Sequence, residues 1–120
     1  MSKKVLIVDD SKISRMFIRQ HISAKQPDWI LSEASTGQEA IDMINAEKPD
    51  YCTMDINMPG MLGTDAARII LAQHPDLRLV IFSANVQEAY QEEARGMGTI
   101  LVSKPVNEKS IAEALAYFAG

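Results

Sequence analysis

Residues 4–25 read KVLIVDDSKISRMFIRQHISAK. The first part, Lys4–Val8, is short, apolar and rich in branched residues, which is typical of a buried strand. The remainder, Lys12–Lys25, has helical spacing, carried by Ile13, Met16, Phe17, His21 and Ile22. Ser11 stands where a helix N-cap is expected. A buried strand followed at once by a helix is the first half of a β-α-β unit.

The same alternation continues along the chain. Short apolar runs predict five strands, at Lys4–Val8, Trp29–Glu33, Tyr51–Met54, Leu77–Phe82 and Thr99–Val102. Segments of helical period predict five helices, at Lys12–Lys25, Thr36–Glu47, Thr64–Gln73, Val86–Arg95 and Glu108–Phe118. Alternating strands and helices predict an α/β fold, a parallel sheet with helices on both faces, and favour the doubly wound form. Without a linker or repeat, residues 1–120 are expected to form one domain.

Composition excludes several classes of protein. The net charge is −4 and lysines and arginines form no block, so direct binding to nucleic acid is not expected. The single cysteine, Cys52, cannot form an internal disulfide, which fits a reducing compartment. No apolar run is long enough for a signal-peptide core or a membrane span. We therefore expect a cytoplasmic protein without membrane insertion.

Polar side chains follow four of the predicted strands. Asp9 and Asp10 come after the first, Asp55 after the third, Ser83 after the fourth and Lys104 after the fifth. The carboxyl ends of parallel strands meet at one edge of the sheet, where ligands bind in doubly wound folds. The sequence therefore predicts that three carboxylates, a hydroxyl and an amine converge there.

This set of groups suits phosphoryl transfer. Three neighbouring carboxylates repel one another and attract a cation, and oxygen ligands favour Mg²⁺. An aspartate can attack phosphorus to form an acyl phosphate, while Lys104 and Ser83 could bind the phosphoryl oxygens. The plainer interpretation makes Asp9 and Asp10 solvated residues that cap the first helix. The presence of Asp55 with Ser83 and Lys104 at the same edge argues against it.

These motifs resemble the receiver domains of response regulators, the CheY-like family. The resemblance covers essentially the whole chain and rests on Asp9-Asp10, Asp55-x-x-Met58-Pro59-Gly60-Met61-x-Gly63, Ser83-Ala84 and Lys104-Pro105. It implies a five-stranded flavodoxin-like sheet of order 2-1-3-4-5, the order known for CheY itself. It also implies a cis peptide bond before Pro105.

The resemblance further implies roles for the acidic residues. Asp55 is the expected phosphoacceptor, and Asp55 and Asp10 are expected to ligate Mg²⁺. Asp9 is expected to act mainly through the water shell of the ion, and Asn57 through its backbone carbonyl. The metal site is thus expected to comprise Asp9, Asp10, Asp55 and Asn57.

Other positions follow the family, with one departure. Ser83 and Lys104 are expected to bind the phosphoryl group beside Asp55. Asn57 and Asn85, each two residues beyond a site residue, are expected to tune the lifetime of the acyl phosphate. The family usually carries Phe or Tyr three residues before the lysine, but this chain has Leu101.

The expected role is therefore a signalling switch of a two-component system, with no enzymatic activity on another molecule. The implied phosphoryl donor is a sensor histidine kinase or a histidine phosphotransfer protein. The expected output face combines Val86–Arg95, the fifth strand and the last helix, and would bind a downstream protein or effector domain. Apolar residues of the last helix could also support a homodimer on phosphorylation.

Two other classes of protein use a similar set of residues or the same fold. A phosphatase of the haloacid dehalogenase type would carry its nucleophile after the first strand, with a second acid two residues on. Here the acidic pair comes first, and Asn57 stands two residues after Asp55. A binding module of the same fold that works without phosphate stays open from sequence alone, although it would not require the complete set of acid, hydroxyl and lysine.

Overall fold

A computed structural model describes residues 2–120 and contains, within them, one five-stranded sheet. Its strands are β1 (Lys4–Val8), β2 (Ile30–Ala34), β3 (Tyr51–Asp55), β4 (Arg78–Ser83) and β5 (Ile100–Ser103). All neighbouring pairs are parallel, and the spatial order is β2-β1-β3-β4-β5. The predicted doubly wound α/β fold and the strand order implied by the family resemblance are confirmed.

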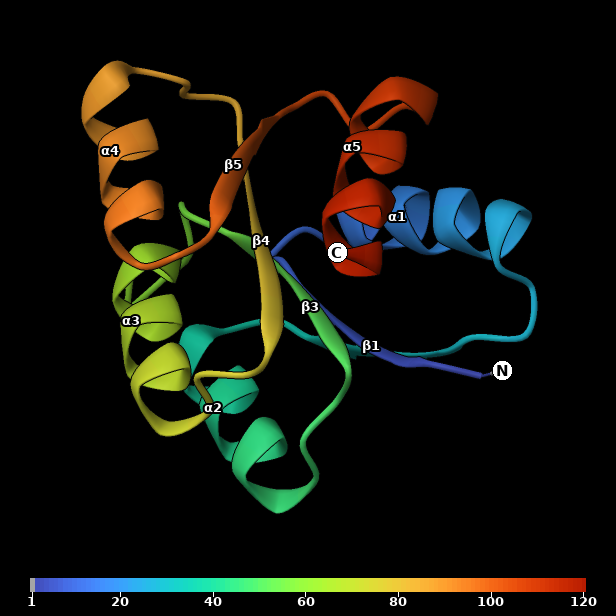
Figure 1. The fold of residues 1–120 in the computed structure, drawn as a ribbon, viewed down its shortest axis with the longest axis horizontal. Coiled ribbons are helices and arrows are strands. Elements are labelled where there is room, and N and C mark those ends of the chain that lie inside the picture. The colour runs from blue at the N-terminus through green and yellow to red at the C-terminus, as the bar shows by residue number, and fades with distance from the viewer. Residues whose placement is uncertain (1) are drawn as a thin grey trace.

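Helices cover both faces of this sheet (Figure 1). They are α1 (Lys12–Lys25), α2 (Gly37–Ala46), α3 (Gly63–Gln73), α4 (Glu88–Gly96) and α5 (Glu108–Ala119). Buried residues of α1 and α5 share one core cluster, and those of α2, α3 and α4 share the other. Ser11 caps the N-terminus of α1 as expected, and the side chains of Thr36 and Asn107 cap α2 and α5 in the same way.

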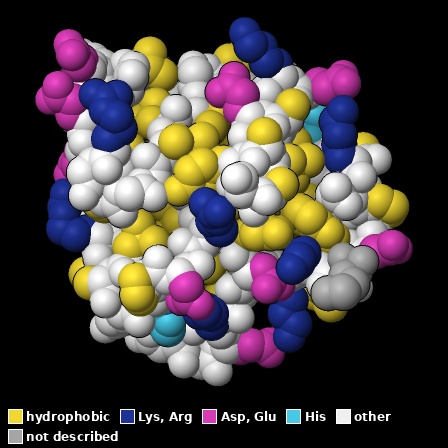
Figure 2. Space-filling model, viewed as in Figure 1, with side chains coloured by type: hydrophobic (Ala, Val, Ile, Leu, Met, Phe, Trp, Pro, Cys, Tyr) yellow, Lys and Arg dark blue, Asp and Glu magenta, His cyan; other side chains and the backbone are white. Residues whose placement is uncertain are grey.

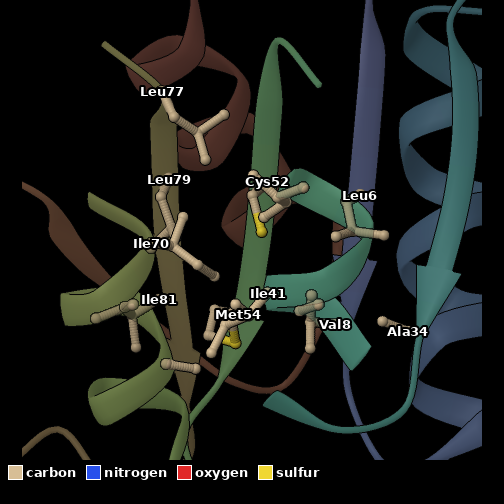
Figure 3. Packing of buried hydrophobic residues seen from close by; sticks show 14 of the residues in the cluster. Leu6, Val8, Ala34, Ile41, Cys52, Met54, Ile70, Leu77, Leu79 and Ile81 are labelled. Carbon is tan, nitrogen blue, oxygen red and sulfur yellow. The ribbon is translucent and has the colours of Figure 1, made fainter. Parts of the chain in front are cut away.

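The core between the sheet and α2–α3 is built from rows of aliphatic side chains (Figure 3). Val8, Met54 and Ile81 lie in register on three neighbouring strands, and all three are fully buried. Burial of each such side chain contributes about 2 kcal/mol relative to exposure. This packed layer fixes the ends of β1, β3 and β4, and with them the residues that follow.

Four strands end one residue later than predicted. The added residues are Ala34, Asp55, Ser83 and Ser103. Backbone hydrogen bonds form the strand ladder whatever the side chain, so a polar or small residue at a strand end cannot be recognised from a hydrophobic pattern. Asp55 is paired with Phe82, and Ser83 with Ser103. The candidate acceptor and hydroxyl thus lie within the rigid sheet rather than in loops.

The first helix has the predicted bounds, but of the side chains that indicated it only Ile22 belongs to the buried face. Ile13 is 61% exposed, and Met16 and Phe17 are also exposed. The buried residues are Ile18 and Ile22. Because α1 packs mainly against β1 and α5, only a narrow strip of it is covered. An apolar surface therefore remains on α1.

Two further features concern the surface. Lysines and arginines are interspersed with aspartates and glutamates on the face in Figure 2, with no patch of one sign. Among residues 2–120, no helix combines the length and apolar character needed to cross a membrane.

Candidate functional site

The acidic residues converge at the carboxyl edge of the sheet. Asp9 and Asp10 follow β1, and Asp55 is the last residue of β3. Each offers a carboxylate oxygen, and these oxygens all lie within 4.8 Å of one another. Asp9 and Asp55 are buried, whereas Asp10 is exposed. A cluster of hard oxygen ligands open to solvent on one side fits a cation such as Mg²⁺, which retains several waters.

The environment of Asp55 opposes its charge. Burial and then the neighbouring Asp9 carboxylate raise the pKa of Asp55, and Lys104 only partly offsets them. The folded protein therefore disfavours the ionised form of the carboxylate at the end of β3. A cation bound in the cluster, in addition to the Lys104 ammonium, would stabilise the ionised form.

Lys104 enters the cluster from the end of β5. Its Nζ lies 3.0 Å from Asp9 Oδ2 and 3.3 Å from Asp55 Oδ1. Burial lowers the pKa of Lys104, but its hydrogen bond to Asp9 and the charges of Asp9 and Asp55 outweigh that effect, so the pKa lies above its usual value. The side chain is therefore an ammonium ion at neutral pH. The Lys104–Pro105 peptide bond is cis, as the resemblance implied.

Donors from the start of α1 surround Asp9. The Ser11 N–H donates to Oδ1 over 2.9 Å, and the Ser14 hydroxyl donates to Oδ2 over 2.7 Å. The Arg15 guanidinium donates to the backbone carbonyl of Asp9 over 2.6 Å. The plainer interpretation of the acidic pair thus holds only in part, because Asp9 accepts bonds from the start of α1 but is buried and faces the cluster. Ser14 and Arg15 were not predicted as site neighbours.

Ser83 ends β4, beside the strand that carries Asp55. It is buried, and its Oγ accepts the Asn85 N–H over 3.0 Å. The Asn85 Oδ1 in turn accepts the Gln87 N–H over 3.0 Å. These bonds form a tight turn, and α4 begins at Glu88 rather than at the predicted Val86. The turn bond uses the Ser83 hydroxyl as an acceptor, so its proton stays available to an incoming oxygen.

Gly63 is required by its close approach to the candidate acceptor. A Cβ at this position would lie 1.7 Å from the backbone carbonyl oxygen of Asp55, which no side chain can tolerate. The Gly63 N–H donates to the Ile56 carbonyl over 2.8 Å. The start of α3 is thereby pressed against the end of β3, and the contact explains the glycine in the quoted motif.

The structure therefore brings Asp9, Asp10, Asp55 and Lys104 together. Ser83 lies at the adjacent strand end. Asn57 is exposed on the loop after β3, and Asn85 is half-buried on the loop after β4. The two candidate lifetime-tuning residues thus lie on the loops that follow the acceptor strand and the hydroxyl strand.

Comparison with known proteins agrees with this geometry. The family model of the response regulator receiver domain matches residues 5–116. The chain belongs to this family. The receiver domain is 38% identical over 116 residues to the chemotaxis protein CheY of Thermotoga maritima, covering 96% of each chain. It is 35% identical over 111 residues to a protein-glutamate methylesterase/protein-glutamine glutaminase of Pyrococcus horikoshii, but covers only 30% of that protein.

A solved structure supports the same assignment. The response regulator domain of Thermotoga maritima CheB superposes with a TM-score of 0.83 at 29% identity, over 99% of this chain and 95% of that one. Receiver domains are regulatory, bind a metal in an acidic pocket, and interact with kinases and effector partners. The acid cluster of this receiver domain lies where that pocket is expected.

Leu101, which replaces the aromatic residue usual in the family, shares a core cluster with an aromatic residue from another element. Leu101 is half-buried on β5 and packs against the core cluster beneath α2, α3 and α4. The half-buried aromatic that packs against the same cluster is Tyr90, on α4. In this receiver domain an aromatic side chain therefore belongs to the helix of the expected output face, not to the strand before Lys104.

Proposed function

We propose that this receiver domain is a switch of a two-component system that accepts a phosphoryl group on Asp55. One observation carries the proposal. The Asp55 carboxylate lies beside the Asp9 and Asp10 oxygens and 3.3 Å from the Lys104 ammonium. A nucleophilic carboxylate, cation ligands and a fixed positive charge are the parts that phosphoryl transfer needs.

The reaction uses few residues. An Asp55 carboxylate oxygen attacks phosphorus, a new O–P bond forms, and the bond from phosphorus to the donor breaks, with its electron pair leaving on the donor. The Lys104 ammonium and the Ser83 hydroxyl bind the oxygens of the transferred group. Mg²⁺ held by Asp10, Asp55 and the Asn57 carbonyl, with Asp9 acting through water, would supply further positive charge. Attack of water on the acyl phosphate later regenerates Asp55.

The proposed donor is a phosphohistidine of a sensor kinase or of a histidine phosphotransfer protein. The apolar surface of α1 supports contact with such a protein. Ile13, Met16 and Phe17 are exposed on the helix whose first turn bonds to Asp9, so a protein resting there could reach Asp55. Replacing Phe17 by Ser should slow transfer from a protein donor and leave transfer from acetyl phosphate unchanged.

The proposed output begins at Ser83. When its hydroxyl turns to the phosphoryl group, the turn through Asn85 must adjust, and α4 follows directly. Phosphorylation would then shift the population of α4 positions. The surface formed by α4, β5 and α5 is the proposed site for a downstream protein or effector domain, and for a homodimer if one forms. A relative's solved complex, that of CheX and CheY from Borrelia burgdorferi, shares this fold with a TM-score of 0.90 at 24% identity, over 98% of this chain and 90% of that one.

The test is direct. The protein is incubated with Mg²⁺ and acetyl phosphate or phosphoramidate, and its intact mass is measured. The proposal predicts the gain of one phosphoryl group by the native protein and none by Asp55→Asn. A native protein that never gains mass under these conditions would favour the phosphate-independent binding module of the same fold.

A further inference from the structure

We propose that Arg15 is a positioning residue for the metal site, acting through the backbone of Asp9. The inference rests on the proposed function, because it concerns Mg²⁺ bound at the acid cluster. Arg15 Nη1 donates to the Asp9 carbonyl oxygen over 2.6 Å, and Arg15 Nε donates to Glu33 Oε1 over 2.8 Å. One guanidinium therefore ties the residue after β1 to β2.

The position of Asp9 is fixed from two directions. Its N–H donates to the Ala34 carbonyl over 3.1 Å, and its own carbonyl accepts the Arg15 bond. Asp9 is where the chain leaves the sheet and turns toward α1, so it has no strand partner further on. The Arg15 bond holds that turn, and the Asp9 side chain then points to the cluster.

Glu33 anchors the guanidinium. The Arg15 hydrogen bond, opposed by burial and supported by Arg19, keeps the pKa of Glu33 below its usual value, so its charge persists at neutral pH. The Arg15 side chain is only 15% exposed. A planar guanidinium donates from several nitrogens in a fixed geometry. A lysine offers one ammonium and cannot reproduce the two bonds with the same geometry.

The Asp9 carboxylate has little freedom to compensate for a shift of its backbone. Its oxygens already accept bonds from Ser11, Ser14 and Lys104. A displaced backbone would move the carboxylate away from the place where it meets the other two acids. Residues that orient ligands in this way typically change metal affinity by about 10- to 100-fold when altered.

Arg19 provides a matched control within the same helix. It lies one turn later and donates to the same residue, to Glu33 Oε2 over 2.8 Å. Its second bond goes to the Leu31 carbonyl over 3.2 Å rather than to Asp9. Arg15→Lys and Arg19→Lys both keep the charge and both disturb the Glu33 pair, but Arg15→Lys alone disturbs Asp9.

The experiment measures the Mg²⁺ dissociation constant by calorimetry for the native protein, Arg15→Lys, Arg19→Lys and Arg15→Gln. We expect binding about tenfold weaker in Arg15→Lys and native binding in Arg19→Lys. At saturating Mg²⁺, the rate of phosphorylation by acetyl phosphate should be native in the control Arg19→Lys. In Arg15→Gln, loss of a positive charge alone would tighten Mg²⁺ binding, whereas loss of positioning weakens it.

The outcomes separate the inference from the proposed function. Native Mg²⁺ affinity in Arg15→Lys, equal weakening in Arg19→Lys, or tighter binding in Arg15→Gln would overturn the positioning role while the phosphorylation switch stands. A native protein that binds no Mg²⁺ and gains no phosphoryl group would overturn both.

Discussion

The Lys104 ammonium lies 3.0 Å from the buried Asp9 carboxylate. The same nitrogen is 3.3 Å from Asp55. Before phosphorylation the lysine is thus shared by two acids, and it partly neutralises the cluster that would bind a metal ion. Under the proposed function, a phosphoryl group on Asp55 would compete with Asp9 for the Lys104 ammonium. We infer that the lysine changes partner during the switch.

Replacing Lys104 by Met should tighten Mg²⁺ binding. The ammonium competes with the ion for the same carboxylates, and its loss removes repulsion of about 1 kcal/mol, or roughly a fivefold change in the dissociation constant. The same variant should accept phosphoryl groups more slowly, because the transferred oxygens lose a bound charge. Calorimetry and a phosphorylation time course would check the two effects. Weaker Mg²⁺ binding would show that Lys104 helps to form the metal site rather than competing for it.

Replacing Asp55 by Asn should stabilise the protein at neutral pH without Mg²⁺. The pKa of Asp55 is raised in the folded state, so the folded protein holds the proton more tightly than the unfolded chain does. The contribution of Asp55 to stability is therefore greatest at pH values below the ordinary carboxyl pKa, and it is lost as pH rises from that pKa through the raised one. The neutral amide avoids this loss, and we expect a gain of roughly 1 kcal/mol in the free energy of unfolding.

Urea denaturation as a function of pH measures this effect. The difference between Asp55→Asn and the native protein should vanish in acid, where Asp55 is protonated in both states. Added Mg²⁺ should also reduce it, because the ion stabilises the native protein and the variant lacks a ligand. If the variant were less stable than the native protein at neutral pH, the ionised Asp55 side chain would not be destabilising.

Thr53 offers a prediction about stability alone. Among the buried side-chain polar atoms of residues 2–120, its Oγ1 is the one without a hydrogen-bond partner. It lies on β3 between Ile7 and Val80, both fully buried. Thr53→Val removes the unpaired hydroxyl at nearly constant volume and should raise the free energy of unfolding by about 1 kcal/mol.

Thr99 is the matched control for Thr53. Its buried hydroxyl donates to the Leu79 carbonyl, so Thr99→Val leaves that carbonyl without this bond and should destabilise the protein by about 1 kcal/mol. Opposite signs in the two variants are expected in chemical denaturation. The same sign in both would mean that shape, rather than hydrogen bonding, decides the result.

Asn57 should tune the lifetime of the phosphorylated state. It is exposed two residues beyond Asp55. Asn57→Ala should open the acyl phosphate to water and speed its decay a few-fold. Such a change lowers the activation free energy of hydrolysis by less than about 1.4 kcal/mol. Asn85→Ala should also change the rate, and both variants should still be phosphorylated. Decay is followed after removal of the donor. Native decay rates in both variants would exclude the tuning role.

The fold could be predicted from sequence because its signals are local. Each strand is an apolar run and each helix has a clear period, and the parallel topology then places Asp9, Asp10, Asp55, Ser83 and Lys104 at one edge. Strand ends were missed by one residue, because a ladder continues through polar side chains. Spacing predicted the bounds of α1 correctly, but spacing alone cannot tell which side of a helix a neighbouring element covers, so the exposure of Ile13, Met16 and Phe17 required the structure.

The surroundings of the site could not be predicted. Arg15 reaches Asp9 and Glu33, which are separated from it by 6 and 18 positions, and no periodic pattern links them. The position of Lys104 between two acids depends on how α1 and β5 pack against the sheet. Such bonds depend on tertiary geometry and require the structure.

Chemical mapping of the phosphorylated residue tests whether Asp55 is the acceptor. The protein is phosphorylated with acetyl phosphate and Mg²⁺, the acyl phosphate is reduced with borohydride, and the modified position is read by peptide sequencing in a mass spectrometer. An aspartyl phosphate is thereby converted to homoserine. We expect homoserine at position 55 in the native protein and at no position in Asp55→Asn. Homoserine at position 9 or 10, or modification that persists in Asp55→Asn, would contradict the assignment of Asp55 as the acceptor.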